Sequence, residues 1–220
     1  LDHLLTRLDE TYATTLAAYT RALASRNRLL KADSPNRRGI TAYDELLSAS
    51  GAVLGQARAA LVDALAPRVA ELFAEISGEE GPALTLRYEP RVQPEVASMR
   101  AALTAALEKD LLRGFTADGP HADDLRENKA RRYASQGQHR AIVLALKVAE
   151  LLELETRTGQ TPLLLLDDFS SELDRQKSRR FFALLGRLGG QVFLTTTHPD
   201  LILVEHDRRD FHVNAGELRL

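Results

Sequence analysis

The sequence predicts an α/β protein in which a parallel sheet is joined to an α-helical arm. Four consecutive leucines, Leu163 to Leu166, follow a proline and end in Asp167 and Asp168. This pattern is typical of a central strand that is covered on both faces. A second short apolar run occurs at 192–194, whereas the first 77 residues place apolar residues at helical spacing.

Composition sets limits on the class of protein. The chain has 220 residues and 44% hydrophobic content, which is enough for a sizeable core. Its net charge of −2 provides no general attraction to nucleic acid, so DNA binding would require local patches. The absence of cysteine excludes disulfides, thiolate metal sites and cysteine nucleophiles, and it suits a cytoplasmic protein.

Neither a membrane-spanning segment nor a secretory signal is evident, so no membrane partner is expected. The chain begins at Leu1 rather than at methionine, within a helical pattern. We therefore expect a fragment whose amino-terminal part is missing.

Two long helices are expected first. Apolar and aromatic residues recur every three to four positions from Leu4 to Leu23, until the sequence Asp-Ser-Pro-Asn at 33–36 interrupts the pattern. A second stretch runs from about Ile40 to Leu65, and Pro67 either kinks it or begins a further helical segment. Each helix would be roughly 40 Å long. The short connection makes them antiparallel neighbours, which together form an arm.

A half-exposed strand is expected at 83–89, where polar and apolar residues alternate, and another helix is expected at 96–112. We divide the chain into a helical arm, residues 1–115, and a second part, residues 116–220.

The loop at 114–125 is rich in glycine, aspartate and other turn residues. One interpretation is a metal site formed by His121, Asp123 and Asp124. The other is a hydrogen-bonded turn that leads into the next strand.

The next helix, 142–154, is preceded by Ser135 and Gln138 at the spacing of a capping box. Its first turn would present free N–H groups and the positive end of the helix dipole, which suit a phosphate. The alternative is an ordinary helix start with no ligand.

Asp174 is predicted to begin a helix that ends at Gly189 and Gly190, and a strand at 192–194 follows. If this strand lies beside the leucine strand, His198 shares a sheet edge with the two aspartates. The alternative is a purely structural histidine. A terminal hairpin is expected from 211 to 220.

Asp167 and Asp168 carry like charges at the end of a buried strand, and they repel each other unless a cation or a proton intervenes. A magnesium nucleotide is one such cation. Otherwise the pair only ends the strand, or Asp168 caps the next helix.

The order of these motifs resembles ABC-type ATPases. The segment 134–138 (Ala-Ser-Gln-Gly-Gln) resembles their signature motif, and 163–168 resembles their Walker B strand. The segment 171–174 (Ser-Glu-Leu-Asp) resembles their D-loop, and His198 their switch histidine. The resemblance implies half of an ABC-type ATPase fold plus an α-helical arm domain.

Within that superfamily, the Gly-Pro-His at 119–121, the Asp-Asp-Leu at 123–125 and the upstream arm resemble the ABC/SMC-like ATPases of bacterial DNA replication and recombinational repair. The chain would be their carboxyl-terminal portion. This resemblance implies an ATP-dependent homodimer that closes around duplex or gapped DNA, hydrolyses ATP slowly, and helps to load recombinase together with other recombination mediators.

The resemblance also implies roles for single residues. Asp167 would hold Mg²⁺, Asp168 would orient or activate water, and His198 would sense the γ-phosphate. An aspartate at 168, where most relatives have glutamate, implies slow turnover. The other expected contacts to ATP, mostly across the dimer interface, are made by Ser135, Gln136, Gly137, Gln138, Ser171 and Asp174.

The phosphate loop G-x-x-x-x-G-K-[ST] does not occur in the chain. We therefore expect it to lie before Leu1 or to be absent, and the chain alone to be inactive as an ATPase. A second hypothesis is a non-catalytic module that binds a partner through its arm. A third, the nucleotide-binding subunit of a transporter, is disfavoured by the long arm.

Two groups of basic residues are candidates for contacts to the DNA backbone, although such runs are usually solvated helix faces. They are Arg126, Lys129, Arg131 and Arg132 before the signature, and Lys177, Arg179 and Arg180 after the D-loop.

Overall fold

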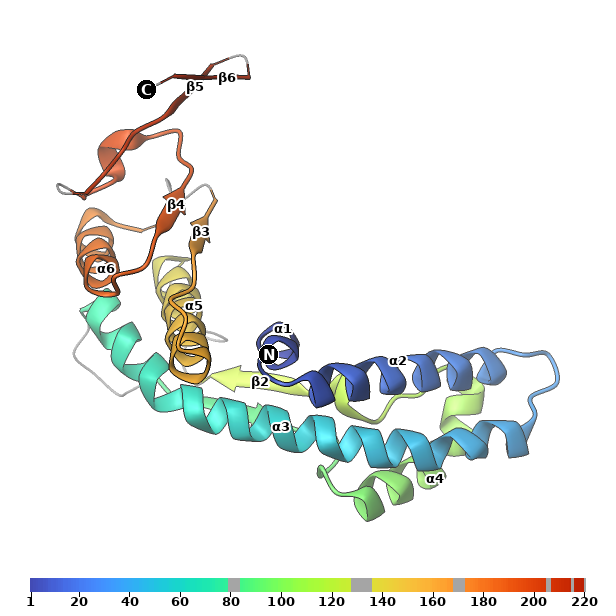
Figure 1. Ribbon diagram of the computed structural model, residues 1–220. Coiled ribbons are helices and arrows are strands. Elements are labelled where there is room, and N and C mark those ends of the chain that lie inside the picture. Colours follow the sequence, from blue (N-terminus) through green and yellow to red (C-terminus); the bar gives the residue numbers. More distant parts are fainter. Residues whose placement is uncertain (79–83, 128–135, 168–172, 205–206, 215, 220) are drawn as a thin grey trace.

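The computed structural model describes residues 1–78, 84–127, 136–167, 173–204, 207–214 and 216–219. Two limbs meet at an angle (Figure 1). One is a long helical arm, and the other is a layer of two helices and two strands. A terminal hairpin extends the layer at the end farthest from the arm (Figure 1).

The arm begins with two helices where the sequence pattern predicts one. Helix α1 spans Asp2–Leu8 and α2 spans Glu10–Leu30. Asp9 separates them because its backbone is extended, with φ −145° and ψ 111°, and its carboxylate caps α2 by accepting from the backbone N–H of Thr11. The apolar spacing continues across this break, so periodicity alone does not reveal it.

Helix α3, Arg37–Ser77, passes through Pro67 without ending. Its 41 residues correspond to about 60 Å, and the 21 residues of α2 to about 30 Å, so the prediction of two helices of roughly equal length is wrong. Leu65 and Val69 are fully buried on either side of the exposed proline, and this packing offsets its missing hydrogen bond. As predicted, α2 lies along α3 (Figure 1).

A two-stranded antiparallel sheet and α4 lie against α3. Strand β1, Leu86–Glu89, pairs with β2, Asp124–Glu127, and α4 spans Val96–Arg113. The loop before α4 approaches α3 closely at Gly55, where an added Cβ would lie 2.7 Å from Pro94. A short 3₁₀ helix, η1, Pro120–Ala122, precedes β2.

The second limb alternates helix and strand. Helix α5, Gln136–Thr158, leads to β3, Leu164–Leu166, and α6, Arg175–Arg187, leads to β4, Val192–Leu194. The sheet is parallel, as predicted, and the two strands are neighbours, with Leu166 opposite Leu194. A 3₁₀ helix, η2, Pro199–Leu201, precedes the terminal hairpin of β5, His212–Asn214, and β6, Glu217–Arg219.

The leucine strand is not covered on both faces. Leu164 and Leu166 are half-buried against the helices, whereas Leu165 is 69% exposed. Phe193, which pairs with Leu165 in the ladder, is 49% exposed on the same side. The described chain supplies helices to only one face of β3 and β4, and this is why the prediction of a doubly covered strand is wrong.

The second limb rests on the carboxyl-terminal half of α3 (Figure 1). Phe181 of α6 is fully buried, and its ring centroid lies 5.8 Å from that of Phe182. The guanidinium of Arg180 donates to the backbone carbonyl of Ser77 at 2.9 Å, at the end of α3. A continuous core therefore joins the limbs.

Charged side chains are buried between the arm helices. Arg26 is completely inaccessible, and its guanidinium donates to Asp44 at 3.0 Å, to Asp110 at 2.8 Å and to the hydroxyl of Thr116 at 2.7 Å. These partners connect α2 to α3, to α4 and to the loop after α4. Nη2 of Arg26 has no hydrogen-bond partner in the part of the chain that the structure describes.

A second ion pair closes the base of the arm. Arg58 on α3 donates from Nε and Nη2 to the carboxylate of Asp2, at 2.8 Å each. The hydroxyl of Tyr12 donates to the same carboxylate at 2.5 Å. Burial by itself would raise the pKa of Asp2, but the hydrogen bonds from Arg58 and Tyr12 outweigh it and lower that pKa.

Asp2→Asn is therefore expected to change how stability depends on pH. Because the folded-state pKa of Asp2 is lowered, its ion pair stabilises the protein above the unfolded-state pKa and is lost as pH falls through the folded-state pKa. The variant should unfold at lower denaturant concentration near pH 7 and lose less stability on acidification. Urea titrations at several pH values measure both effects, and parallel acid profiles for the two proteins would contradict the assignment.

Candidate nucleotide site

Asp167 and Thr195 meet where β3 and β4 end. The backbone N–H of Thr195 donates to the carbonyl of Leu166 at 2.9 Å, which continues the parallel ladder one residue beyond the strands. The hydroxyl of Thr195 donates to the carboxylate of Asp167. The predicted sheet edge therefore exists, and it carries an exposed carboxylate with a hydroxyl beside it.

Both helices of this limb begin at that same edge. Because only a short connection joins α5 to β3 and another joins α6 to β4, each helix runs antiparallel to the strand that follows it. The amino ends of α5 and α6 therefore lie at the end of the layer where β3 and β4 end (Figure 1). The positive dipole ends of both helices favour an anion at this position.

Asp174 caps α6, as the sequence predicts. Its carboxylate accepts from the backbone N–H of Gln176 at 3.0 Å and of Lys177 at 2.9 Å. The ammonium group of Lys177 donates to its other oxygen at 2.9 Å. The backbone amide of Lys177, followed by its side chain, lowers the pKa of Asp174 and keeps it ionised.

His198 is exposed just beyond β4, at the same edge as Asp167. Its backbone N–H donates to the hydroxyl of Thr196 at 3.0 Å, and Nδ1 lies 2.9 Å from the hydroxyl of Thr197. These local contacts orient the ring without burying it. Thr195 is not among the site residues predicted from the sequence, and the parallel register is the signal that pairs it with Asp167.

The predicted signature residues are partly described. Gln136, Gly137 and Gln138 form the first turn of α5, at the end of the layer that holds Asp167. Three expected site residues, Ser135, Asp168 and Ser171, lie outside the described residues. Their roles, including the capping box of Ser135 with Gln138, stay predictions.

The oxygen atoms at this edge suit Mg²⁺. This ion prefers hard oxygen ligands and is usually held by one or two carboxylates together with water and substrate phosphates. Asp167 supplies one carboxylate, and the hydroxyl of Thr195 adjoins it. Within the described ranges no group of three or more histidine, cysteine or acidic side chains forms a metal cage, so phosphate oxygens would have to complete the coordination.

The loop at 114–125 forms the hydrogen-bonded turn rather than a metal site. Nδ1 of His121 lies 2.6 Å from the hydroxyl of Tyr19, and Nε2 lies 3.0 Å from the carbonyl of Thr116. Asp123 accepts from the hydroxyl of Tyr88 and, at 2.6 Å, from the backbone N–H of Arg91. These residues fasten the loop to the arm.

Several of the basic residues proposed for DNA contacts have partners within the protein. Arg126 pairs with Glu89 at 2.8 Å, Lys177 with Asp174, and Arg180 with the carbonyl of Ser77. Lys129, Arg131 and Arg132 lie outside the described residues, and Arg179 is exposed. In the second group, Lys177 and Arg180 are therefore bonded within the protein, and Arg179 alone has no side-chain partner among the described residues.

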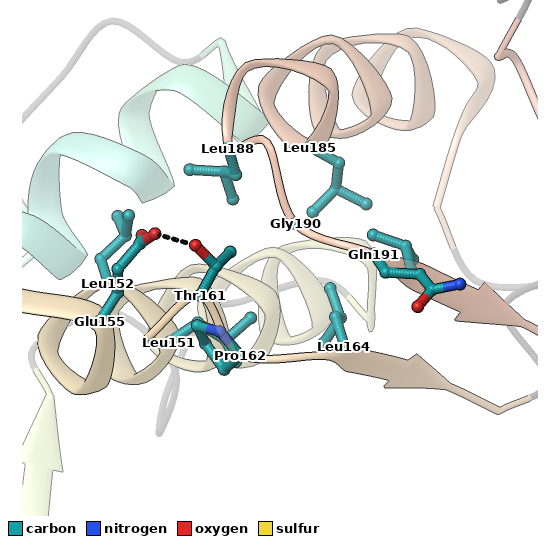
Figure 2. A pocket seen from close by; sticks show the side chains of 11 residues that line it. Leu151, Leu152, Glu155, Thr161, Pro162, Leu164, Leu185, Leu188, Gly190 and Gln191 are labelled. Carbon is teal, nitrogen blue, oxygen red and sulfur yellow. Dashed lines mark hydrogen bonds between the residues drawn. The ribbon is translucent and has the colours of Figure 1, made fainter. Parts of the chain in front are cut away.

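A small pocket occupies the opposite end of the same layer (Figure 2). Leu151 and Leu152 of α5, Leu185 and Leu188 at the end of α6, and Leu164 of β3 line it. The hydroxyl of Thr161 donates to the carboxylate of Glu155 at 2.6 Å across its rim (Figure 2). Its lining is apolar and it lies away from Asp167, so it is not part of the candidate site.

Known proteins match most of the chain. It is 46% identical over 196 residues to the DNA replication and repair protein RecF of Anaeromyxobacter sp. (strain Fw109-5), covering 84% of this chain and 53% of that protein. It is 43% identical over 199 residues to RecF of Myxococcus xanthus, covering 84% and 52%. The chain thus spans about half the length of these curated relatives. No family model matches it.

A solved structure of the recombination mediator protein RecF with ATP superposes with a TM-score of 0.80 at 30% identity. The match covers 99% of this chain and 60% of that one. In the described part of the chain, no helix is long and apolar enough to cross a membrane.

The strand-end carboxylate, the two helix amino ends at the same edge and the helical arm define part of an ABC-type ATPase domain. Within that class the chain belongs to the RecF family of DNA replication and repair proteins. It spans about half the length of its curated relatives.

Proposed function

We propose that the chain supplies one half of a composite ATP site in a RecF-like DNA-repair ATPase. The parallel pairing of β3 with β4 carries this proposal, because it places Asp167, Thr195 and His198 at one edge. The amino ends of α5 and α6 lie beside these three residues, and a helix amino end favours a phosphate. A phosphate-binding loop, which the chain does not contain, would complete the site.

Each residue has a defined role in this proposal. Asp167 holds Mg²⁺ when the nucleotide is bound, and the hydroxyl of Thr195 keeps its carboxylate oriented. Asp168 positions the attacking water. His198, exposed at the same edge, contacts the γ-phosphate. Phosphoryl transfer depends mainly on such positioning and on electrostatic stabilisation.

The first turn of α5 serves the nucleotide of a second subunit. Ser135, Gln136, Gly137 and Gln138 would face the γ-phosphate across a homodimer, and Ser171 and Asp174 would line the interface. ATP then joins the two subunits. Exposed Leu165 and Phe193 leave one sheet face open, which suits further ATPase structure packing against β3 and β4.

The closed dimer would hold duplex or gapped DNA, and the protein would act with other recombination mediators of the RecO or RecR kind in the cytoplasm. The solved RecF structure with ATP, described within the RecFOR pathway, supports this assignment. Residues 1–115 would act as the arm and residues 116–220 as part of the ATPase domain.

Ser135→Arg in the intact protein tests the signature role. A bulky cation at this position should abolish ATP-dependent dimerisation and leave ATP binding to the monomer unchanged. Analytical ultracentrifugation with and without ATP measures dimerisation, and calorimetry measures ATP binding. If dimerisation and ATP binding were lost together, or if dimers persisted, the result would argue against a signature that acts on the opposite subunit.

A further inference from the structure

The far end of the arm presents charge and apolar surface that the proposed ATP site does not use. Here α2 ends at Leu30, α3 begins at Arg37 and α4 ends at Arg113. The guanidinium of Arg37 pairs with Glu108, which fixes the end of α4 beside the start of α3. Gly114, just after α4, lies close to the side chain of Lys31, since an added Cβ there would be 3.4 Å from its Cγ.

This arm tip, defined as residues 28–38 and 108–115, is strongly cationic. Asp33 and Glu108 are its exposed acids, because Asp110 is buried against Arg26. Apart from Arg37, none of its cations forms an ion pair with a residue that the structure describes. The exposed cations of the tip are Arg28, Lys31, Arg37, Arg38, Lys109 and Arg113.

Two large apolar side chains lie among these charges. Leu112 is 90% exposed, the most exposed of the large hydrophobic residues in the described chain, and Phe115 is 48% exposed. Leu112 precedes Arg113 directly and follows Lys109 by three positions, so one turn of helix brings the three together. A leucine surrounded by water on the last turn of a helix contributes nothing to the packing of the arm.

We propose that the arm tip binds an acidic peptide segment of a partner protein that also carries apolar side chains. The cations attract the carboxylates, and Leu112 and Phe115 accept the apolar groups, which is how an amphipathic segment is recognised. Nucleic acid fits less well. Phosphates need only the cations, and a base can stack on a phenylalanine ring but gains little from a leucine.

The tip is held by buried contacts, so it is a preorganised surface. Thr116 donates from its backbone N–H and its hydroxyl to the side-chain oxygen of Asn27, at 2.8 Å each. The same hydroxyl accepts from Arg26. These bonds anchor the loop that follows Phe115 to α2 and keep Leu112 and Phe115 exposed together.

Fluorescence anisotropy with two synthetic peptides tests the proposal. The first alternates aspartate and glutamate with two leucines and a phenylalanine, and the second replaces those three residues by serine at the same net charge. The chain should bind the first peptide at least about tenfold more tightly than the second. Leu112→Ser combined with Phe115→Ser should remove that preference, and Lys109→Glu combined with Arg113→Glu should weaken both peptides.

Val53→Ser, at a 46% exposed position on α3 away from the tip, is the matched control and should bind as the unaltered chain does. Equal affinity for both peptides, or a preference that survives the Leu112 and Phe115 substitutions, would overturn the proposal. So would single-stranded or duplex DNA that displaces the first peptide and depends on the same four residues. None of these measurements involves ATP, so they are independent of the proposed nucleotide site.

Discussion

Replacing Arg26 by methionine should destabilise the protein by about 3–5 kcal/mol, because it leaves two buried carboxylates without their cation. Asp110 is fully buried and Asp44 is 6% exposed, and Arg26 contacts both. Burial already raises the pKa of Asp44 against the opposing effect of Arg26. Without the guanidinium, both carboxylates must be desolvated as anions or take up protons. Equilibrium urea unfolding at pH 7 measures the loss.

Two controls make this test specific. Arg21→Met changes an exposed arginine on the same helix and should stay within about 0.5 kcal/mol of the unaltered chain. Adding Asp44→Asn and Asp110→Asn to Arg26→Met should recover part of the stability, since no buried charge then remains. The deficit of the single variant should also shrink as pH falls, because the orphaned carboxylates become neutral. If Arg26→Met lowered the free energy of unfolding no more than Arg21→Met does, the result would contradict a stabilising role for the ion pairs of Arg26.

Phe181→Ala should cost about 3–5 kcal/mol, the range for a buried phenylalanine that leaves a cavity. Phe181 is fully buried on α6, which packs against the carboxyl-terminal half of α3. The cavity would open where the second limb joins the arm. Thermal or chemical unfolding gives the magnitude, and Phe211→Ala, at a 47% exposed position, should have a much smaller effect. Similar losses for the two variants would mean that α6 is not docked as described.

The parallel sheet was predictable from the sequence. Short apolar runs at 163–166 and 192–194, separated by a helical pattern, predict strands of a parallel sheet, and the structure shows that the two strands are also adjacent. The edge that holds Asp167 and His198 follows directly from that topology. The cap at Asp174, the helix at 96–112 and the terminal hairpin were also predictable, because local hydrogen bonding and turn residues determine them.

Other features depend on packing that no local pattern reveals. The hydrophobic spacing of α1 and α2 continues across Asp9, so only the capping geometry shows the break. Pro67 remains inside α3 because Leu65 and Val69 are buried on both sides of it. Coverage of the leucine strand depends on which elements surround it, and the described chain covers one face alone.

The buried ion pairs of Arg26 were only partly predictable from the sequence. It occupies the buried face of α2 at helical spacing from Ala22 and Leu30, where a charged residue requires a buried partner. Asp44 occupies the equivalent face of α3, four residues after Ile40. Neither position identifies the other without knowledge of how the two helices align, and Asp110 is 84 residues from Arg26 along the chain.

Mixing two inactive variants of the intact protein tests the central claim most directly. Ser135→Ala removes the signature hydroxyl without the bulk that would block dimerisation, and Asp167→Ala disables the magnesium side. If each ATP site combines the two sides from opposite subunits, a mixed dimer of the two variants contains one intact site. An equimolar mixture should then regain roughly a quarter of the unaltered ATPase rate, although neither variant is active alone. A mixture as inactive as its components would contradict a site shared between subunits.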